Sequence, residues 1–150
     1  MAGMEALGRL VNVIPIGAGN AFKMRGASGV LVVCTGTDTF TVNEASSFGG
    51  TYTALNCIKN VYGSTATNGT AGWTKLTYVN GTTPLSAVTI GGGSPTIASA
   101  TMLAFHVFTS EFSDPFNYLK VTVAASGLVT VLPYDLVHQR GPANLEILGA

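Results

Sequence analysis

The feature that most constrains the fold of this chain is a succession of short runs rich in Val, Ile, Thr, Phe and Tyr, each bounded by Gly, Asn, Asp or Pro. β-branched and aromatic side chains favour extended backbone, and the bounding residues favour turns. The pattern therefore predicts an all-β or nearly all-β chain. Strands are expected at residues 10–14, 21–25, 30–34, 39–43, 73–78, 86–90, 101–108, 118–124 and 128–133.

Two kinds of strand are visible in the hydrophobic pattern. In residues 39–43 the apolar Phe40 and Val42 alternate with polar residues, which is typical of a strand with one buried face. Residues 30–33 form a continuous apolar run, which predicts a central strand covered on both faces. A compact β-sandwich or β-barrel-like domain accommodates both kinds.

Residues 43–62 give the weakest pattern. Leu55, Ile58 and Tyr62 have a spacing that favours a short helix, whereas Gly49 and Gly50 oppose one. At most one short helix is expected in the chain. Residues 68–69 and 80–81 are Asn-Gly pairs, which tolerate positive φ and predict hairpin or loop tips rather than glycosylated sites.

The length of 150 residues fits one domain with its own core. We expect an N-terminal arm at residues 1–9, a β domain at 10–140 and a C-terminal arm at 141–150, because both ends lack a strong period. The apolar residues of these ends have little reason to exist on a solitary monomer. The expected protein-interface residues are Leu7, Leu10, Arg140, Pro142, Asn144, Leu145 and Ile147.

Charge is scarce in this chain. Only 9% of its residues are charged, against about 25% in ordinary soluble domains, and seven basic residues balance seven acidic ones. Such a chain has no basic field for nucleic acid or an anionic membrane, and the uncharged residues 76–110 are interrupted by Gly and Pro, which argues against a membrane span. A signal peptide is not expected, since residues 1–10 contain Glu5 and Arg9. Weak charge suits a protein that packs beside neighbours.

The residues that carry metal chemistry are few and scattered. Cys34, Cys57, His106 and His138 show no metal-ligand spacing, so we expect no metal and no cofactor. The sequence leaves open whether the two cysteines pair, because pairing depends on the fold.

Catalysis is not expected either. Asp135 and His138 could join a serine only on paper, because no Gly-x-Ser-x-Gly motif is present. Glu44, Glu111 and Asp114 form no recognisable carboxylate pair, and the glycine clusters at 17–19 and 91–93 lack the context of a phosphate loop. We therefore expect no enzyme and no small-molecule substrate. Trp73 is expected in the core, with an exposed binding anchor as the alternative.

Three segments resemble small virion proteins of tailed bacteriophages, particularly phages of actinobacterial hosts. They are residues 38–42 (DTFTV), 66–75 (ATNGTAGWTK) and 118–145 (YLKVTVAASGLVTVLPYDLVHQRGPANL), the last being the most distinctive. The resemblance implies a head decoration (cement) or minor capsid protein that grips the outer surface of the capsid, often as a trimer or dimer. It transfers no catalytic residue.

The resulting expectation is a structural virion protein, assembled in the host cytoplasm, whose partners are the major capsid protein and copies of itself. One alternative is a tail tube, tail terminator or head–tail joining protein, which would form rings. Another is a receptor- or carbohydrate-binding module of a phage fibre, which would expose aromatic side chains. The sequence does not decide the number of subunits or the strand order.

Overall fold

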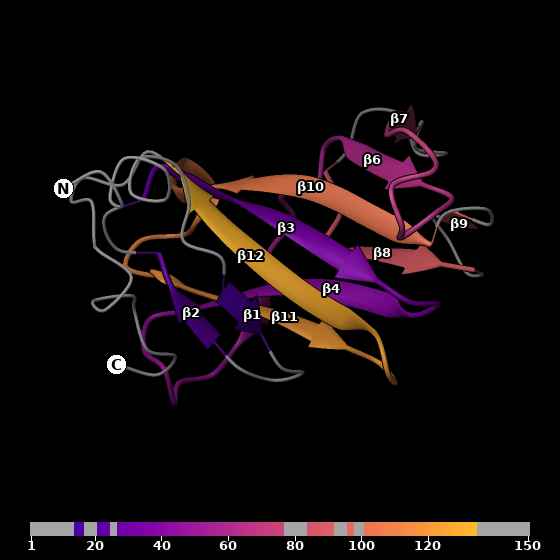
Figure 1. Ribbon diagram of the computed structural model, residues 1–150. Coiled ribbons are helices and arrows are strands. Elements are labelled where there is room, and N and C mark those ends of the chain that lie inside the picture. Colours follow the sequence, from indigo (N-terminus) through magenta and orange to yellow (C-terminus); the bar gives the residue numbers. More distant parts are fainter. Residues whose placement is uncertain are drawn as a thin grey trace, which may run out of the picture.

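Two β-sheets face each other across a shared apolar core (Figure 1). The computed structural model describes residues 14–16, 21–24, 27–76, 84–91, 96–97 and 101–134, and the structural statements below concern these residues. Sheet A has the strand order β1 (Ile14–Ile16), β12 (Leu128–Tyr134), β3 (Gly29–Thr35), β10 (Met102–Phe108), β6 (Val61–Ser64) and β7 (Thr74–Leu76). Neighbouring strands of sheet A are antiparallel.

Sheet B forms the second layer. Its order is β2 (Ala21–Lys23), β11 (Tyr118–Val123), β4 (Thr39–Ala45), β8 (Ala87–Ile90) and β9 (Thr96–Ile97), and β5 (Thr53–Ala54) also pairs with β4. All pairs are antiparallel except β8 with β9. The architecture is a nearly all-β sandwich, so the predicted fold class is confirmed.

The core follows from strand alternation and register. Val32 on β3 lies between Phe105 on β10 and Val131 on β12, and all three are fully buried. From the opposite sheet, Phe40 and Val42 face the same interior, as their alternation with polar residues predicted. Burial of these side chains is the main favourable contribution to folding.

The short helix considered for residues 43–62 is absent. This stretch contains β5 and β6, and Ile58 exchanges two backbone hydrogen bonds with Leu85, at 2.9 and 3.0 Å. Leu55 and Ile58 are both buried, but they lie in non-helical chain between β5 and β6, where Leu55 N donates to Val42 O and Cys57 N donates to Leu55 O. The only helical turn in the described ranges is the 3₁₀ turn η1 (Thr109–Glu111).

Other strand predictions differ from the structure mainly at their ends. The expected strand at 10–14 overlaps β1 only at Ile14, and residues 10–13 lie outside the described part. The short strands β5, β6 and β9 were not predicted; β6 includes Gly63 and Ser64, which are poor strand formers.

The expected loop tip at residues 68–69 lies between β6 and β7, where Gly69 has a φ of +79°. Residues 80–81 are outside the described ranges, as are both predicted arms, 1–9 and 141–150, so their boundaries stay predictions. Within the described ranges no helix is long and apolar enough to cross a bilayer.

Candidate interaction surface

One outer face of the sandwich is apolar. On β3 the inward Val30 and Val32 are fully buried, whereas Leu31 and Val33 between them are half-buried and point away from the core. The prediction that this strand is covered on both faces was therefore wrong: it is central within its sheet, but only one face joins the core. Register places the following residues beside Leu31 and Val33 on the outer face of sheet A: Thr35, Tyr62, Ser64, Met102, Ala104, His106, Phe108, Leu128, Thr130, Leu132 and Tyr134.

This face carries no charge across four adjacent strands. No Asp, Glu, Lys or Arg occupies an outward position of β12, β3, β10 or β6, and the first charged residue on this side is Lys75 on β7, opposite Tyr62. Leu128 is 70% exposed and Phe108 is 44% exposed. Ser64 and Ala104 are buried at their outward positions, so the exposed part of this face comes from the other residues, His106, Phe108, Leu128 and Tyr62 above all. An exposed apolar patch without charge is typical of an interaction site.

Three rings form a cluster at one end of this face. His106 stacks on Phe108, with ring centroids 6.0 Å apart, and the Tyr134 ring makes edge-to-face contacts with both, with centroid distances of 5.7 Å to His106 and 6.5 Å to Phe108. We call His106, Phe108 and Tyr134 the aromatic cluster. Edge-to-face and offset contacts of this kind stabilise a ring arrangement beyond the area they bury.

Gly29 makes room for the cluster. It lies opposite Tyr134 on one side and Phe108 on the other. A Cβ atom at Gly29 would collide with Tyr134 Oη, and would lie 2.8 Å from its Cζ and 2.9 Å from the carbonyl oxygen of Val107. The Tyr134 ring therefore packs directly over the backbone of Gly29, and a side chain at position 29 would occupy the space that the ring takes.

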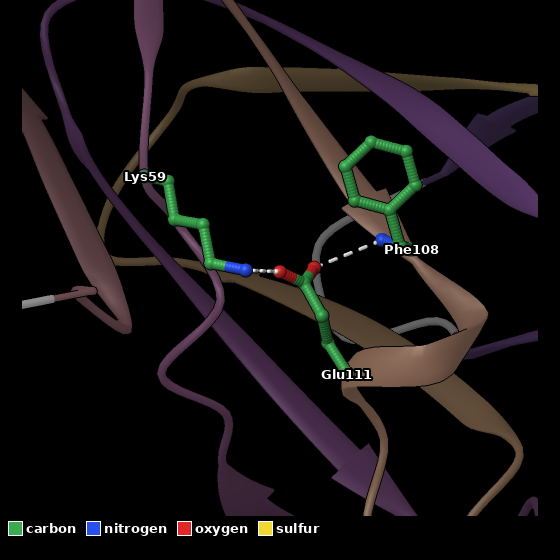
Figure 2. Close-up of polar contacts among 3 residues, drawn as sticks. All are labelled: Lys59, Phe108 and Glu111. Atoms are coloured by element: carbon green, nitrogen blue, oxygen red, sulfur yellow. Dashed lines mark hydrogen bonds and ion pairs between the residues drawn. The ribbon is translucent and has the colours of Figure 1, made fainter.

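An acidic residue fixes the backbone of Phe108. Figure 2 shows the Glu111 carboxylate between two donors: Oε1 accepts a charged hydrogen bond from Lys59 Nζ, and Oε2 accepts one from Phe108 N at 3.0 Å. The side-chain hydrogen bond from Lys59 to Glu111 raises the pKa of the Lys59 ammonium. Glu111 thus caps η1 and holds the end of β10, which positions the Phe108 ring.

The outer face of sheet B has a different character. Its outward positions carry hydroxyl and amide groups that bond to one another: Thr39 Oγ1 lies 2.9 Å from Thr89 Oγ1, and Asn43 Nδ2 donates to Thr122 Oγ1 at 3.0 Å. Lys23 lies 5.6 Å above the ring centroid of Tyr118, and Lys120 lies 4.8 Å above that of Tyr52. This polar face contrasts with the apolar face of sheet A.

A second exposed aromatic site lies at the β6–β7 edge. Trp73 is 49% exposed, so the expectation that it belongs to the core was wrong. It immediately precedes β7, and the neighbouring strand β6 exposes Tyr62. The alternative given above, an exposed anchor, agrees with this position. Its polar neighbours in sequence, residues 65–70, gave no reason for burial.

The buried carboxylates hold loops together. Asp38 accepts backbone hydrogen bonds from Thr39, Ala125 and Gly127, the last at 2.7 Å. Desolvation raises the pKa of Asp38, but the backbone N–H groups of Gly127, Thr39, Ala125 and Ser126 outweigh it and hold that pKa below its ordinary value. The Asp38 carboxylate therefore has a structural role: it joins the β3–β4 turn to the β11–β12 turn.

Glu44 has a similar structural role at the other end of β4. It is buried, and its two oxygens accept hydrogen bonds from Ser113 N at 2.8 Å and Ser113 Oγ at 2.7 Å. This contact fastens the loop that follows η1. The burial of both carboxylates was not predicted, because their donors are 69 to 89 residues away in the chain, apart from Thr39.

The cysteines are free and buried, which answers the question of pairing left open by the sequence. Burial raises the pKa of the Cys34 thiol, and burial with the nearby Glu111 carboxylate raises that of Cys57 to about 12. Both thiols therefore stay protonated and weakly nucleophilic at neutral pH. They pack as small apolar side chains.

The remaining predicted sites are distributed as follows. His106 lies on the outer face of sheet A, and Asp135 and His138 are outside the described ranges. So are all the expected interface residues, Leu7, Leu10, Arg140, Pro142, Asn144, Leu145 and Ile147. Among the residues that the structure describes, no three His, Cys, Asp or Glu side chains are grouped to hold a metal ion.

No protein-family model, curated protein or solved structure matches the chain.

Proposed function

We propose that the protein is a structural virion component, a head decoration protein that binds the outer surface of a phage capsid. The uncharged apolar outer face of sheet A is the observation that carries this proposal. The phage assignment is supported by the sequence resemblance of residues 38–42, 66–75 and 118–145. The face and the predicted arms would act together, the face through side chains and the arms through added strands and apolar anchors.

The size of the face favours a repeating partner over an isolated dimer. Strands β12, β3 and β10 have seven residues each. β6 adds four residues, so at a rise of about 3.4 Å per residue and a strand spacing of about 4.8 Å the four strands cover roughly 400 Å² in projection. A stable interface buries about 800 Å² on each partner. One face therefore binds weakly, and many copies on a lattice gain strength through avidity.

The test is sedimentation of the purified protein with capsid shells, together with copy counting in purified particles by mass spectrometry. Phe108→Lys and Leu128→Lys place a charge on the outer face of sheet A, and both should abolish co-sedimentation. Phe48→Lys is the matched control, because Phe48 is 45% exposed but lies in the loop after β4. It should bind normally.

A copy number near that of the major capsid protein would support decoration. Absence from particles would discard the virion proposal, and equal binding by all three variants would discard the proposed face. A small number of copies in a ring would instead indicate a tail or joining protein.

A carbohydrate-binding role is the second candidate, favoured by the exposed Trp73 and the uncharged polar loop before it. An exposed indole offers a flat apolar surface for a sugar ring, and hydroxyl groups nearby can bind sugar hydroxyls. Glycan-array binding that disappears in Trp73→Ala, with shell binding absent, would favour this candidate. An empty array would reject it.

A further inference from the structure

The loop between β6 and β7 contains a tripeptide, Asn68-Gly69-Thr70, in which one side-chain carbonyl accepts two hydrogen bonds. Asn68 Oδ1 accepts a hydrogen bond from Thr70 N at 3.2 Å and another from Thr70 Oγ1 at 2.7 Å. All three residues are exposed. Gly69 has a φ of +79°, and a Cβ built on it meets nothing within 4 Å, so its backbone is open to solvent.

We propose that Asn68 is a self-modification site, at which the turn itself promotes conversion of the side-chain amide to a carboxylate. The backbone nitrogen of Gly69 forms a bond with Asn68 Cγ, and the Cγ–Nδ2 bond breaks. Nδ2 leaves as ammonia and takes the proton from Gly69 N. Water then opens the resulting succinimide at either carbonyl, which gives aspartate or isoaspartate at position 68.

The hydrogen bonds at Asn68 Oδ1 are placed where the reaction needs them. When Gly69 N attacks Cγ, negative charge develops on Oδ1, and donors at hydrogen-bond distance from that oxygen stabilise the transition state. Thr70 supplies both donors. Gly69 supplies an attacking nitrogen with no side chain beside it.

The two ends of the β6–β7 loop are held together, which limits the conformations that residues 68–70 can adopt. The buried hydroxyl of Ser64 lies 3.0 Å from the carbonyl oxygen of Ala66 and 3.1 Å from that of Ala71, and it accepts a hydrogen bond from Ala66 N at 3.4 Å. Ser64 thereby joins the two ends of the loop. Less entropy is lost in reaching the reactive conformation when the ends are already held.

The product changes the electrostatics of the loop. Residues 65–73 contain no charged side chain, and the whole chain has a net charge of zero. Conversion of Asn68 introduces the only charge of this loop, which ends at the exposed Trp73.

The test follows conversion of Asn68 by peptide mapping of the folded full chain, with a synthetic peptide of residues 65–72 as the unstructured reference. One exposed hydrogen bond changes a rate by about 2- to 12-fold. We therefore expect Asn68 in the folded chain to react at least about 2-fold faster than Asn68 in the peptide. Isoelectric focusing should show the matching acidic shift.

Variants identify the source of the acceleration. Thr70→Val removes the hydroxyl donor and should slow the folded chain by about 2- to 12-fold. Thr70→Ser keeps the donor, and Thr67→Val changes an exposed threonine elsewhere in the loop, so both should react at the original rate. Ser64→Ala should slow the reaction by loosening the loop. Slower conversion in the folded chain than in the peptide, or equal rates for Thr70→Val and Thr67→Val, would overturn the proposal.

Discussion

Replacement of Asp38 tests whether a buried carboxylate joins the two sheets at one end of the sandwich. Asp38 Oδ2 accepts from Gly127 N at 2.7 Å, and Ala125 N lies 3.1 and 3.0 Å from the two carboxylate oxygens. Oδ1 also accepts from Thr39 N at 2.7 Å. Alanine at this position leaves three backbone N–H groups without their acceptor.

The magnitude follows from how many of these donors water can reach. A hydrogen bond to a charged group contributes about 1.5–3 kcal/mol, and a buried donor without a partner costs about 1–3 kcal/mol. Only the bond from Gly127 is fully buried, and the turn lies near bulk water, so the other two contribute little after screening. We expect Asp38→Ala to lower the free energy of unfolding by about 2–4 kcal/mol, and Asp38→Asn by about 1–2 kcal/mol.

The effect should depend on pH with a definite sign. Desolvation raises the pKa of Asp38, but the backbone donors together lower it by more than desolvation raises it. The folded-state pKa therefore lies below the unfolded value of about 3.9. Such a group stabilises the fold fully above its unfolded pKa, and this stabilisation is lost as pH falls through the folded pKa. The difference between the original protein and Asp38→Asn should therefore be constant near neutral pH and shrink below about pH 4.

Urea unfolding followed by circular dichroism measures these differences. Asp114→Asn is the control for loss of one negative charge, because Asp114 is exposed, and it should change the free energy of unfolding by less than about 0.5 kcal/mol. Equal stability of Asp38→Asn and the original protein at neutral pH would refute the reasoning. So would a difference that grows on acidification.

Two further predictions concern buried contacts. Gly29→Ala should lower the free energy of unfolding by about 1–3 kcal/mol in urea titrations, because its Cβ meets Tyr134 and the rigid carbonyl of Val107; unchanged stability would contradict the described packing. Cys34 and Cys57 should resist a thiol reagent at mildly alkaline pH until urea unfolds the chain, because burial raises both pKa values; rapid labelling of the native protein would show that the thiols are accessible.

Local patterns predicted most of the longer strands, because the alternation of apolar and polar side chains is visible in neighbouring residues. Phe40 and Val42 show which face of β4 is buried before any partner is known. The pattern failed for residues 30–33, because an apolar side chain at an outward position looks the same in sequence as one in the core. Only the register of β3 with β10 and β12 shows that Leu31 points outward.

The candidate surface was harder to predict for the same reason. Phe108 comes from β10, Tyr134 from β12 and Gly29 from β3, so the aromatic cluster exists only through non-local pairing. Glycine at position 29 carries no local signal of the ring that covers it. The buried carboxylates are equally non-local, since Gly127 is 89 residues from Asp38. Sequence rules place acidic residues on the surface by default.

In the part of the chain that the structure describes, fewer acidic groups lie free on the surface than the composition suggests. Of the four acidic residues in the described ranges, Asp38 and Glu44 are buried on backbone and hydroxyl donors, and Glu111 is bound to Lys59 and to the backbone of Phe108. Only Asp114 remains exposed without such a bond. Acidic side chains in this part of the chain therefore hold turns in place and contribute little repulsion between molecules. Because the outward positions of β12, β3, β10 and β6 carry no charged side chain, the apolar face of sheet A would have no charge to desolvate against a protein lattice or a neighbouring subunit.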